Sequence, residues 1–510
     1  MISRIRSAVL NGLDVAATEV EVGFTQGIPG MVIVGLPDNS VKESKERLRL
    51  AIRQANIEYP AATKIVVNLS PADLRKEGSA LDLPIAVGII KNRYRLEGPI
   101  FEESLFYGEL NLTGELNPVK GVLNVALFAR QQGMRRLIIP YGNRLEAAFL
   151  KGIDVYPLRH LGEVMALISD DGALRPWRCD IPNAGAESGE YDFSEIKGQH
   201  LAKRVMEIAC AGFHNVLMIG PPGSGKSMIS RSLPSILPEM SEEEILETSL
   251  IYSASGLLSE KGGLLTRRPF RSPHHTISDV GMSGGGKYPL PGEISLSHNG
   301  VLFLDELPYF KKSALEVLRQ PLEDGRISIS RSLTSFTYPA KFMLVAAMNP
   351  CEDSIGAGHD PYFRCSESQR RAYYSKISKP LLDRIDLHLE VKKVKLEEIT
   401  SAAKAESSAA IRRRIHAARE IQLRRFRPLA RKIFANGQMK NPEIRRFCPL
   451  KTEELDLLKG AVERFNLSAR AYFKILKIAR TIADLAQCET IESAHLQEAL
   501  QYRALDFTRF

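Results

Sequence analysis

The chain has 510 residues, too many for one hydrophobic core, so two to four domains are expected. A composition of 44% hydrophobic and 25% charged residues excludes a disordered chain and a fibre, and the net charge of +9 permits an anionic partner without requiring one. The six cysteines are scattered, with no C-x-x-C pair, which favours a cytoplasmic protein over a secreted disulfide scaffold. No apolar run approaches the roughly 20 residues that cross a bilayer, and no secretory signal is evident, so no membrane partner is expected.

The predicted elements divide the chain into three domains. Residues 1–170 mix alternating β-type segments with amphipathic helical ones and predict an α/β domain. Residues 171–194, rich in Gly, Pro, Ala and acidic residues, predict a linker. Residues 195–395 contain short apolar strands separated by helices, which is typical of a parallel sheet, and residues 396–510 predict a helical lid. The expected fold class is therefore multidomain α/β.

A phosphate-binding loop is the strongest motif. It follows an apolar strand and precedes a helix, as G-x-x-x-x-G-K-[ST] requires, and it consists of Gly220, Pro221, Pro222, Gly223, Ser224, Gly225, Lys226 and Ser227. Glycines let successive backbone N–H groups face phosphate oxygens. We expect Lys226 to reach the β- and γ-phosphates of ATP and the Ser227 hydroxyl to bind Mg²⁺.

Further along the chain, the strand sequence GVLFLDE ends with two carboxylates. Two acids at the end of a buried strand are costly unless a cation or a reaction uses them. We expect Asp305 to hold Mg²⁺ and Glu306 to polarise the attacking water. Asn349, at the end of the strand FMLVAAMN, is a candidate to orient that water, although Asn before Pro is also an ordinary turn. Arg384 and Arg470 are candidate γ-phosphate contacts, or else surface ion-pair arginines.

The motifs in this order resemble those of an AAA+ ATPase. Two further segments resemble the magnesium-chelatase-like branch of that family. Its helix-2 insert is similar to the segment between the glycine-rich loop and Asp305, RPFRSPHHTISDVGMSGGGKYPLPGEISLSHNG. Its pre-sensor hairpin is similar to the segment after Glu306, LRQPLEDGRISISRSLTSFTYPAKFMLVAAMNP. The N-terminal sequences GLPDNSVKESKERLRLAI, VNLSPADLRKEGSALDLPIA and GELNLTGELNPVKGVLNVALFA are similar to those of the ComM/YifB family. The resemblance covers essentially the whole chain.

The resemblance implies roles for the candidate residues. Gly220–Ser227 would be Walker A, Asp305 and Glu306 Walker B, and Asn349 sensor 1. Arg384 would be the arginine finger acting on a neighbouring subunit, and Arg470 would be sensor 2. The hairpin around Leu322 to Ser335 and the helix-2 insert would be pore elements, with Lys287, Arg326 and Arg331 as candidate DNA contacts.

The family resemblance also implies a function. Its members are thought to form hexameric rings that translocate on single-stranded or branched DNA and drive branch migration during natural transformation and homologous recombination, alongside other recombination proteins. Two alternatives are a magnesium chelatase ATPase subunit and a protein-remodelling ATPase that does not translocate. The first is disfavoured because no D-x-S-x-S metal motif is found, the nearest sequence failing at Lys42.

The N-terminal domain resembles the Lon protease domain (the ribosomal S5 domain 2-like fold), with Ser79 at the position of the nucleophile. Alignment places Val125 where that family has its catalytic lysine, so we expect a noncatalytic relative.

Two groups of residues raise the question of a metal. Cys351 and Cys365, with His359 and Asp353, are the remnant of a cysteine-rich insert found in relatives; zinc is possible there, but a metal-free loop is favoured. His274 and His275 are adjacent in an expected extended segment, so their side chains should point apart and make polar contacts within the insert.

The positive charge is concentrated in one stretch. Residues 411–434 contain nine basic side chains and one acidic side chain, a local charge of +8 in a predicted helix. We expect this stretch to line a subunit interface or to form a solvated helix face, and the DNA prediction therefore rests on motifs and resemblance.

Overall fold

The computed structural model describes residues 2–73, 76, 78–169, 174–179, 191–258, 263–286, 290–330, 335–351, 365–395, 397–398, 405–465 and 467–503. Its contacts divide the chain into two compact units, neither of which is continuous in sequence. The first comprises Met1–Asn183 and Ser241–Thr266, and the second comprises Ala184–Met240 and Arg267–Phe510. Ser241–Thr266, which the sequence analysis assigned to the ATPase core, thus packs with the N-terminal unit, and the core and the lid form one unit.

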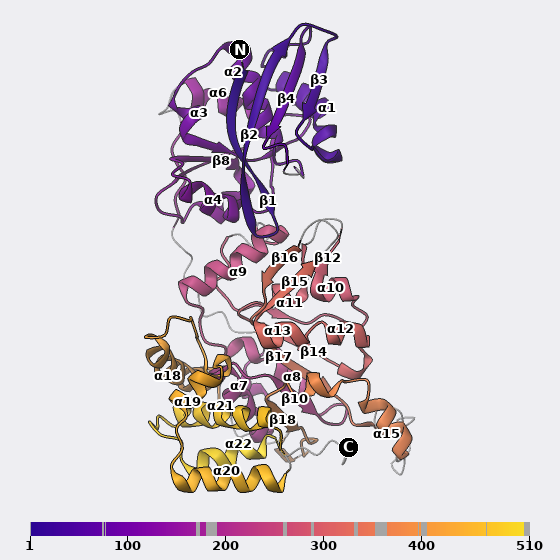
Figure 1. The fold of residues 1–510 in the computed structure, drawn as a ribbon, viewed down its shortest axis with the longest axis vertical. Helices are drawn as coiled ribbons and strands as arrows, with labels where there is room; N and C mark the ends of the chain where they lie inside the picture. The colour runs from indigo at the N-terminus through magenta and orange to yellow at the C-terminus, as the bar shows by residue number, and fades with distance from the viewer. Residues whose placement is uncertain are drawn as a thin grey trace. The chain divides into compact units, whose positions relative to one another are not determined.

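A four-stranded sheet of order β1-β2-β4-β3 carries the first unit (Figure 1). Its strands are the alternating segments of the sequence, β1 Ile2–Asn11, β2 Asp14–Thr25, β3 Gly30–Val34 and β4 Lys64–Ser70. Burial alternates along β4, because successive side chains of a strand point to opposite faces. The helix α2 (Asp82–Tyr94), which is almost entirely buried, packs against β1 and β2, and α1 (Asn39–Gln54) contacts α2.

A second, smaller sheet completes this unit. Its strands β5, β8 and β9 are parallel, and β6 and β7 form a separate antiparallel pair. The remaining elements are α3 Pro99–Glu103, β5 Ser104–Phe106, β6 Glu109–Leu110, β7 Leu116–Asn117, α4 Val122–Gln131, β8 Arg136–Pro140, η1 Tyr141–Asn143, α5 Arg144–Ala147, β9 Asp154–Leu158 and α6 Leu161–Ser169.

The helix α9 (Glu242–Ser255) packs against α4 of the first unit, and one of its serines caps α4. The helix α4 begins after Gly121. Because glycine has no side chain, it cannot cap the free N–H groups in the first turn of this helix. Ser253 of α9 supplies the acceptors: its carbonyl accepts from Gly121 N at 2.8 Å and its hydroxyl from Leu123 N at 3.1 Å. The same hydroxyl donates to the Glu146 carboxylate at 2.6 Å. Burial raises the pKa of Glu146 to about 7, although Ser253 and Asn143 hydrogen-bond to it.

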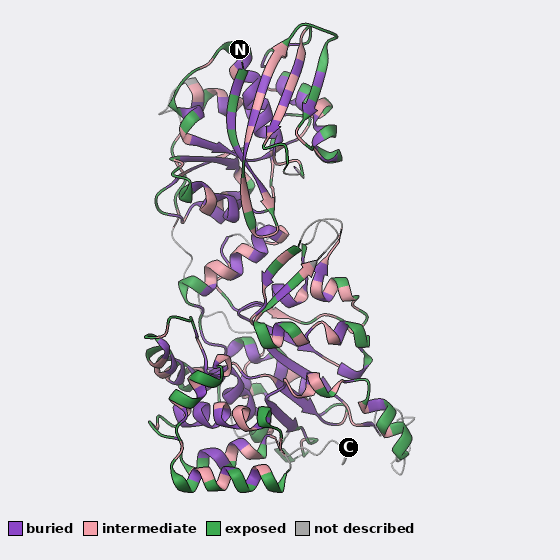
Figure 2. Ribbon diagram, viewed as in Figure 1, coloured by how far each residue is buried: buried purple, intermediate pink, exposed green. Residues whose placement is uncertain are grey.

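The second unit is built on a five-stranded sheet of order β11-β14-β17-β10-β18, and every pair in it is parallel. The strands are β10 Val216–Ile219, β11 Phe270–Arg271, β14 Val301–Leu304, β17 Met343–Met348 and β18 Leu387–Glu390. The central strands are buried throughout, as their uninterrupted apolar sequences predict (Figure 2). The predicted α/β fold class with a parallel sheet is confirmed.

Helices and two hairpins surround this sheet. The hairpins are the antiparallel pairs β12 (Gly284–Gly285) with β13 (Leu290–Pro291) and β15 (Arg326–Ser330) with β16 (Ser335–Pro339), where the insert and the pre-sensor hairpin were expected. Lys287 and Arg331 lie outside the described residues. The helical elements are η2 Phe193–Glu195, α7 His200–Gly212, α8 Lys226–Arg231, η3 Leu233–Ser235, α10 Asp279–Ser283, α11 Glu293–Leu296, η5 Leu307–Tyr309, α12 Lys312–Glu316, α13 Arg319–Asp324, α15 Glu367–Tyr374 and α16 Lys379–Leu382.

The C-terminal part is helical, as predicted. It contains α18 Ser408–Phe426, η6 Asn436–Gln438, α19 Asn441–Phe447, α20 Thr452–Arg464, α21 Ala469–Leu485 and α22 Ser493–Gln501. Within the described ranges, no helix is both long enough and apolar enough to cross a membrane.

The basic stretch 411–434 is in part a solvated helix face, one of the two expectations, because Arg413 and Arg424 of α18 are exposed, while other arginines make contacts within the chain. Arg412 Nε donates to Ser235 O at 3.0 Å, and Arg414 pairs with Glu207 of α7, so α18 is fastened to the core. Arg425 Nη1 lies 2.8 Å from Oδ2 of the buried Asp484 in α21. These three arginines therefore make contacts within the chain, and α18 ends at Phe426, before Arg431 and Lys432.

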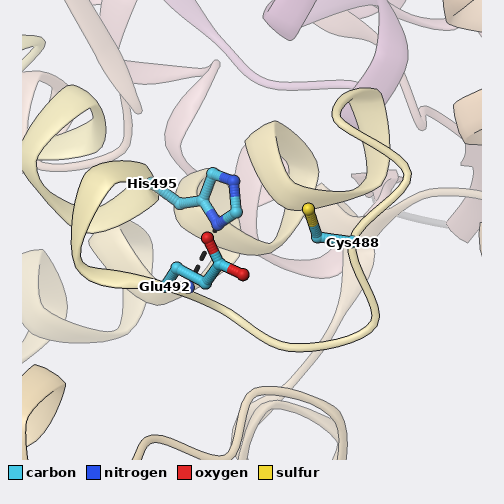
Figure 3. Close-up of side chains that lie close together, drawn as sticks. All are labelled: Cys488, Glu492 and His495. Carbon is cyan, nitrogen blue, oxygen red and sulfur yellow. Dashed lines mark hydrogen bonds between the residues drawn. The ribbon is translucent and has the colours of Figure 1, made fainter.

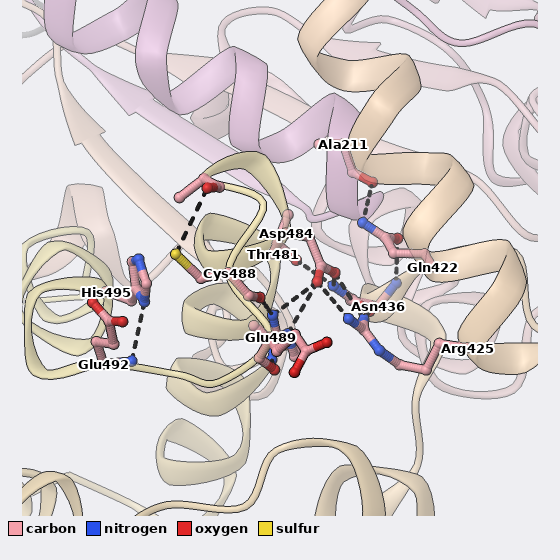
Figure 4. A network of polar contacts seen from close by, with 12 residues as sticks. Ala211, Gln422, Arg425, Asn436, Thr481, Asp484, Cys488, Glu489, Glu492 and His495 are labelled. Carbon is pink, nitrogen blue, oxygen red and sulfur yellow. Dashed lines mark hydrogen bonds and ion pairs between the residues drawn. The ribbon is translucent and has the colours of Figure 1, made fainter.

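A buried polar network continues from Asp484 to the core (Figure 4). Asn436 Nδ2 donates to Asp484 Oδ2 at 2.7 Å, and Asn436 N donates to Gln422 Oε1 at 3.0 Å. Gln422 Nε2 in turn donates to Ala211 O, at the end of α7, at 3.1 Å. Because each of these buried groups has a partner, the network orients the lid helices on the core.

The Glu146 carboxyl predicts a pH dependence of the first unit. Its folded-state pKa, about 7, lies above its ordinary 4.5, so the folded state binds the extra proton between these values and loses stability as the pH rises through them. Integrated over that range, the loss is about 3 kcal/mol. We expect Glu146→Gln to be more stable relative to the wild type at about pH 8 than at about pH 5.

Hydrogen exchange of peptides from α4 and α9 measures this locally, after correction for the intrinsic pH dependence of exchange. Glu102→Gln, an exposed carboxylate of α3, is the matched control and should show no such change between the two pH values. An identical response of both variants would contradict the assignment.

Candidate functional site

The glycine-rich loop joins β10 to α8 with a backbone that only glycine tolerates at key positions. Gly223 and Gly225 have φ values of +76° and +91°, in the left-handed region that favours glycine. A Cβ atom on Gly220 would lie 2.1 Å from Val391 O, so this position also excludes a side chain. The loop therefore presents its N–H groups at the start of α8, as phosphate binding requires.

Four of the predicted side chains meet at the carboxyl edge of the parallel sheet. Lys226 is buried, and its Nζ donates to Gly220 O at 2.6 Å and to Asn349 Oδ1 at 2.9 Å. Ser227 Oγ donates to Asp305 Oδ2 at 2.6 Å. Because β10, β14 and β17 are parallel neighbours, the residues that follow them arrive at one place. The cluster combines a phosphate-binding cation with oxygen ligands suited to Mg²⁺.

Glu306 points to a residue that the sequence analysis did not connect with it. Its φ is +53°, in the left-handed region, and its carboxylate Oε2 lies 3.3 Å from His275 Nδ1. The rings of His274 and His275 have centroids 4.1 Å apart, so the expectation that they point apart is wrong. The segment turns at His275 instead of remaining extended. His274 does make the expected local contact, with its Nδ1 2.9 Å from Thr276 Oγ1.

Two further side chains support the loop and were missed from the sequence. Gln199 Nε2 donates to Ser224 O at 3.0 Å and to Lys392 O at 2.7 Å, so it ties the loop to the segment after β18. The Tyr373 hydroxyl donates to Asn349 O at 2.9 Å and fixes the backbone of that residue. Neither belongs to a sequence motif, and only the positive φ of +55° at Gln199 marks it as unusual in the fold.

Arg384 lies at the opposite edge of the same sheet. It precedes β18, and β18 runs parallel to β10, with Val216 paired to Leu387 and Ile219 to Glu390. Asn215, just before β10, donates its Nδ2 to Arg384 O at 3.1 Å, which places Arg384 at the amino edge. The strand between this edge and the glycine-rich loop spans at least about 10 Å. The structure therefore does not bring Arg384 to the loop of its own subunit.

Arg470 joins Arg384 at the amino edge. Both arginines form ion pairs with Glu323 of α13, and the Arg470 Nη2–Glu323 Oε1 distance is 3.4 Å. They border a cleft of about 830 Å³, which is also lined by Lys474 and Lys477. The candidate residues thus fall into two groups, one at each edge of the sheet.

A buried ion pair fixes the position of α21 at this edge. Lys474 Nζ lies 2.9 Å from Asp386 Oδ1, and Lys474 also donates to Ile385 O. Burial alone would raise the pKa of Asp386, but Lys474 and His214 hold that pKa well below its ordinary value. Burial lowers the pKa of Lys474 to about 8. Arg470 is one helical turn before Lys474, so this pair brings Arg470 next to Arg384.

The two cysteines that are candidate zinc ligands, Cys351 and Cys365, bond to each other. The sulfur atoms of Cys351 and Cys365 are joined in a disulfide, so neither is available as a thiolate ligand. His359 and Asp353 lie outside the described residues.

Among the residues that the structure describes, one group of three possible ligands lies close together, Cys488, Glu492 and His495 (Figure 3). Glu492 N donates to His495 Nδ1 at 3.0 Å, as part of a capping box at the start of α22. The cap accounts for the positions of Glu492 and His495 without a metal.

The Lon-like position in the first unit has no lysine partner for the serine at the expected place. The Ser79 hydroxyl hydrogen-bonds to the Glu109 carboxylate, and Val125 is buried within α4. That this domain is a noncatalytic relative of the Lon protease domain stays a prediction.

The comparisons with known proteins cover both units. Residues 20–143 match the family described as subunit ChlI of Mg-chelatase, residues 192–399 match magnesium chelatase, subunit ChlI, and residues 405–503 match its C-terminal region. The chain is 42% identical over 507 residues to the uncharacterized protein YifB of Escherichia coli, covering 99% of this chain and 97% of the relative. It is 41% identical over 503 residues to competence protein ComM of Haemophilus influenzae, covering 97% and 96%.

A chelatase subunit is a more distant relative. The magnesium-chelatase 67 kDa subunit of Chlorobaculum parvum is 26% identical over 168 residues, which cover 32% of this chain and 24% of the relative. The match to YifB and ComM, in contrast, extends over nearly the full length. The chain therefore belongs to the ComM/YifB family of magnesium-chelatase-like AAA+ ATPases.

Proposed function

We propose that this ATPase is a cytoplasmic DNA motor, a ring-forming helicase that drives branch migration of recombination intermediates during natural transformation and homologous recombination. The observation that carries the proposal is the division of the site between two edges of one sheet. Lys226, Ser227, Asp305 and Asn349 meet at the carboxyl edge, whereas Arg384 and Arg470 meet at the amino edge. A complete site then needs the amino edge of a second subunit.

The carboxyl edge fits ATP with Mg²⁺. The Ser227 hydroxyl and Asp305 carboxylate, 2.6 Å apart, are the oxygen ligands that Mg²⁺ prefers. Mg²⁺, when bound, neutralises charge on the phosphates. Lys226 exchanges its loop carbonyls for phosphate oxygens, Glu306 polarises the attacking water and Asn349 orients it.

A ring follows from heterologous contacts between identical subunits. Each subunit offers a carboxyl edge on one side and an amino edge on another, and such head-to-tail contacts close into a ring when the rotation permits. Six subunits are expected from the family. Arg384, as the finger, and Arg470, as sensor 2, would then act on the γ-phosphate of ATP bound by the neighbour.

The DNA role is supported by the two hairpins and by a named relative. The hairpins β12–β13 and β15–β16 form in the regions that resemble pore elements, and Arg326 begins β15. Together with Lys287 and Arg331 it remains a proposed contact to single-stranded or branched DNA. The relative from Haemophilus influenzae is named a competence protein, which favours recombination over metal insertion. Other recombination proteins are the expected partners.

The proposed motor predicts distinct effects of substitutions at Lys226 and Glu306. We expect the wild type to migrate three- and four-stranded junctions with ATP, and forked DNA to stimulate its ATPase. Lys226→Ala should lose ATP binding, because it removes the phosphate-contacting cation. Glu306→Gln should bind ATP but lose turnover, because it removes the group that polarises water. Equilibrium binding of a fluorescent ATP analogue and a gel-based junction assay separate the two variants.

Two results would count against the motor. Junction migration that persists in both variants would exclude ATP-driven movement by this site. An intact ATPase that neither responds to DNA nor migrates junctions would leave the protein-remodelling alternative.

A subunit-mixing experiment tests the divided site. Arg384→Ala alone should lower ATP turnover about a thousandfold, as expected for an arginine that stabilises the transferring phosphoryl group. Mixed with an equal amount of Lys226→Ala subunits, it should regain turnover at about a quarter of the contacts, since a random head-to-tail ring pairs an intact loop with an intact arginine that often. No recovery in assembled mixed rings would place both residues in one subunit's site.

A further inference from the structure

One carboxylate bridges the two arginines of the amino edge. Glu323 offers one oxygen to Arg384 and the other to Arg470, and these arginines come from different parts of the chain, the turn after α16 and the start of α21. A simple surface ion pair joins one cation to one anion. Here a single anion holds two guanidinium groups that would otherwise repel each other.

The bridging carboxylate resembles the ligand that both arginines are proposed to meet. Two guanidinium groups around one group of oxygens is the arrangement that suits a terminal phosphate. Arg384 is also not saturated: within the described part of the chain, its buried Nε has no hydrogen-bond partner. A phosphate has more oxygens and more charge than a carboxylate, so it can replace Glu323 and also satisfy further donors.

Glu323 can leave this position easily. Its side chain is 52% exposed, whereas that of Arg384 is 14% exposed. Solvent weakens an ion pair in which one partner is half exposed, and the phosphate that displaces Glu323 keeps the charge of the largely buried Arg384 paired. The arginines, in contrast, stay in place: Arg384 Nη1 donates to Pro380 O at 2.7 Å, and α21 is held by the buried Lys474–Asp386 pair.

Movement of Glu323 can reach the β15–β16 hairpin directly along the chain. It is the penultimate residue of α13, and only Asp324 and Gly325 separate it from β15. Gly325 caps α13 with φ +67°, its N–H donates to Pro321 O at 2.8 Å, and its carbonyl accepts from Ala340 N at 2.8 Å, just after β16. The end of α13 is therefore hydrogen-bonded to the base of the β15–β16 hairpin.

We propose that Glu323 is a positioning residue that holds Arg384 and Arg470 until the terminal phosphate of a nucleotide on the neighbouring subunit displaces it, and that its release frees the β15–β16 hairpin to move. The proposal rests on the action of both arginines on the neighbouring subunit. It adds the step by which nucleotide binding at one subunit reaches the hairpin of the next.

The test compares Glu323→Gln with Asp324→Asn in the full chain. Gln keeps the size and hydrogen-bonding shape of Glu323 but removes the charge that holds the arginines. Asp324 is the next acid on the same helix and borders the same cleft, but within the described residues it forms no ion pair with either arginine. Any effect of lost negative charge on folding or on the cleft should appear in both variants.

The first measurement is hydrogen exchange of peptides spanning residues 319–339, with and without a nonhydrolysable ATP analogue. In the wild type and in Asp324→Asn, exchange should rise several-fold when the analogue binds to assembled rings. In Glu323→Gln it should be high in both conditions. Equal, nucleotide-dependent exchange in both variants would overturn the proposal.

The second measurement is the number of junctions migrated per ATP hydrolysed. Glu323→Gln should hydrolyse ATP at least as fast as the wild type, since its arginines are already free, but migrate several-fold fewer junctions per ATP. A parallel fall in both rates, with their ratio unchanged, would show an ordinary structural role. If the wild type itself migrates no DNA, the motor is wrong, and the exchange measurement still decides the role of Glu323.

Discussion

The common direction of the five core strands is the constraint on which the rest of the second unit depends. Parallel strands send all their carboxyl ends to one edge of the sheet, and there the glycine-rich loop, Asp305 and Asn349 converge. The same rule sends the residues that precede the strands to the other edge, which is where Arg384 stands. Short strands thus separate the cluster at the glycine-rich loop from the arginine pair. Movement of side chains alone does not bridge the two edges within one chain.

The strands and the glycine-rich loop could be predicted from the sequence, because each depends only on residues within one short segment. The strands were recognisable because burial on both faces demands an uninterrupted apolar run, as in β10 and β17, and the loop because its backbone requires glycine. Contacts between distant segments left no such signal. Gln199 bridges Ser224 and Lys392, and His275 meets Glu306, only because the fold brings them together. The prediction for the two histidines failed because it assumed an extended backbone where the chain turns.

The charge distribution shows how composition can mislead. The excess of positive charge in residues 411–434 suggested a subunit interface or a solvated helix face, but three of its arginines also make contacts within the chain: Arg412 with Ser235, Arg414 with Glu207 and Arg425 with Asp484. These contacts place cations where α18 crosses from the core to the lid. An arginine has five N–H donors for carbonyls and carboxylates. It therefore suits the contacts of α18 with the core and the lid better than an apolar residue of similar size. Part of the positive charge of this stretch is therefore structural.

The assignment of Ser241–Thr266 to the first unit constrains how the protein can evolve. The chain passes between the two units three times, after Asn183, after Met240 and after Thr266, so the N-terminal unit is not an appendage on a single tether. Loss of the first 170 residues would remove Gly121, Leu123 and Glu146, with which Ser253 of α9 forms hydrogen bonds. A gene could not exchange this unit for another by one recombination event at the linker. The N-terminal unit and the ATPase core are therefore expected to evolve together.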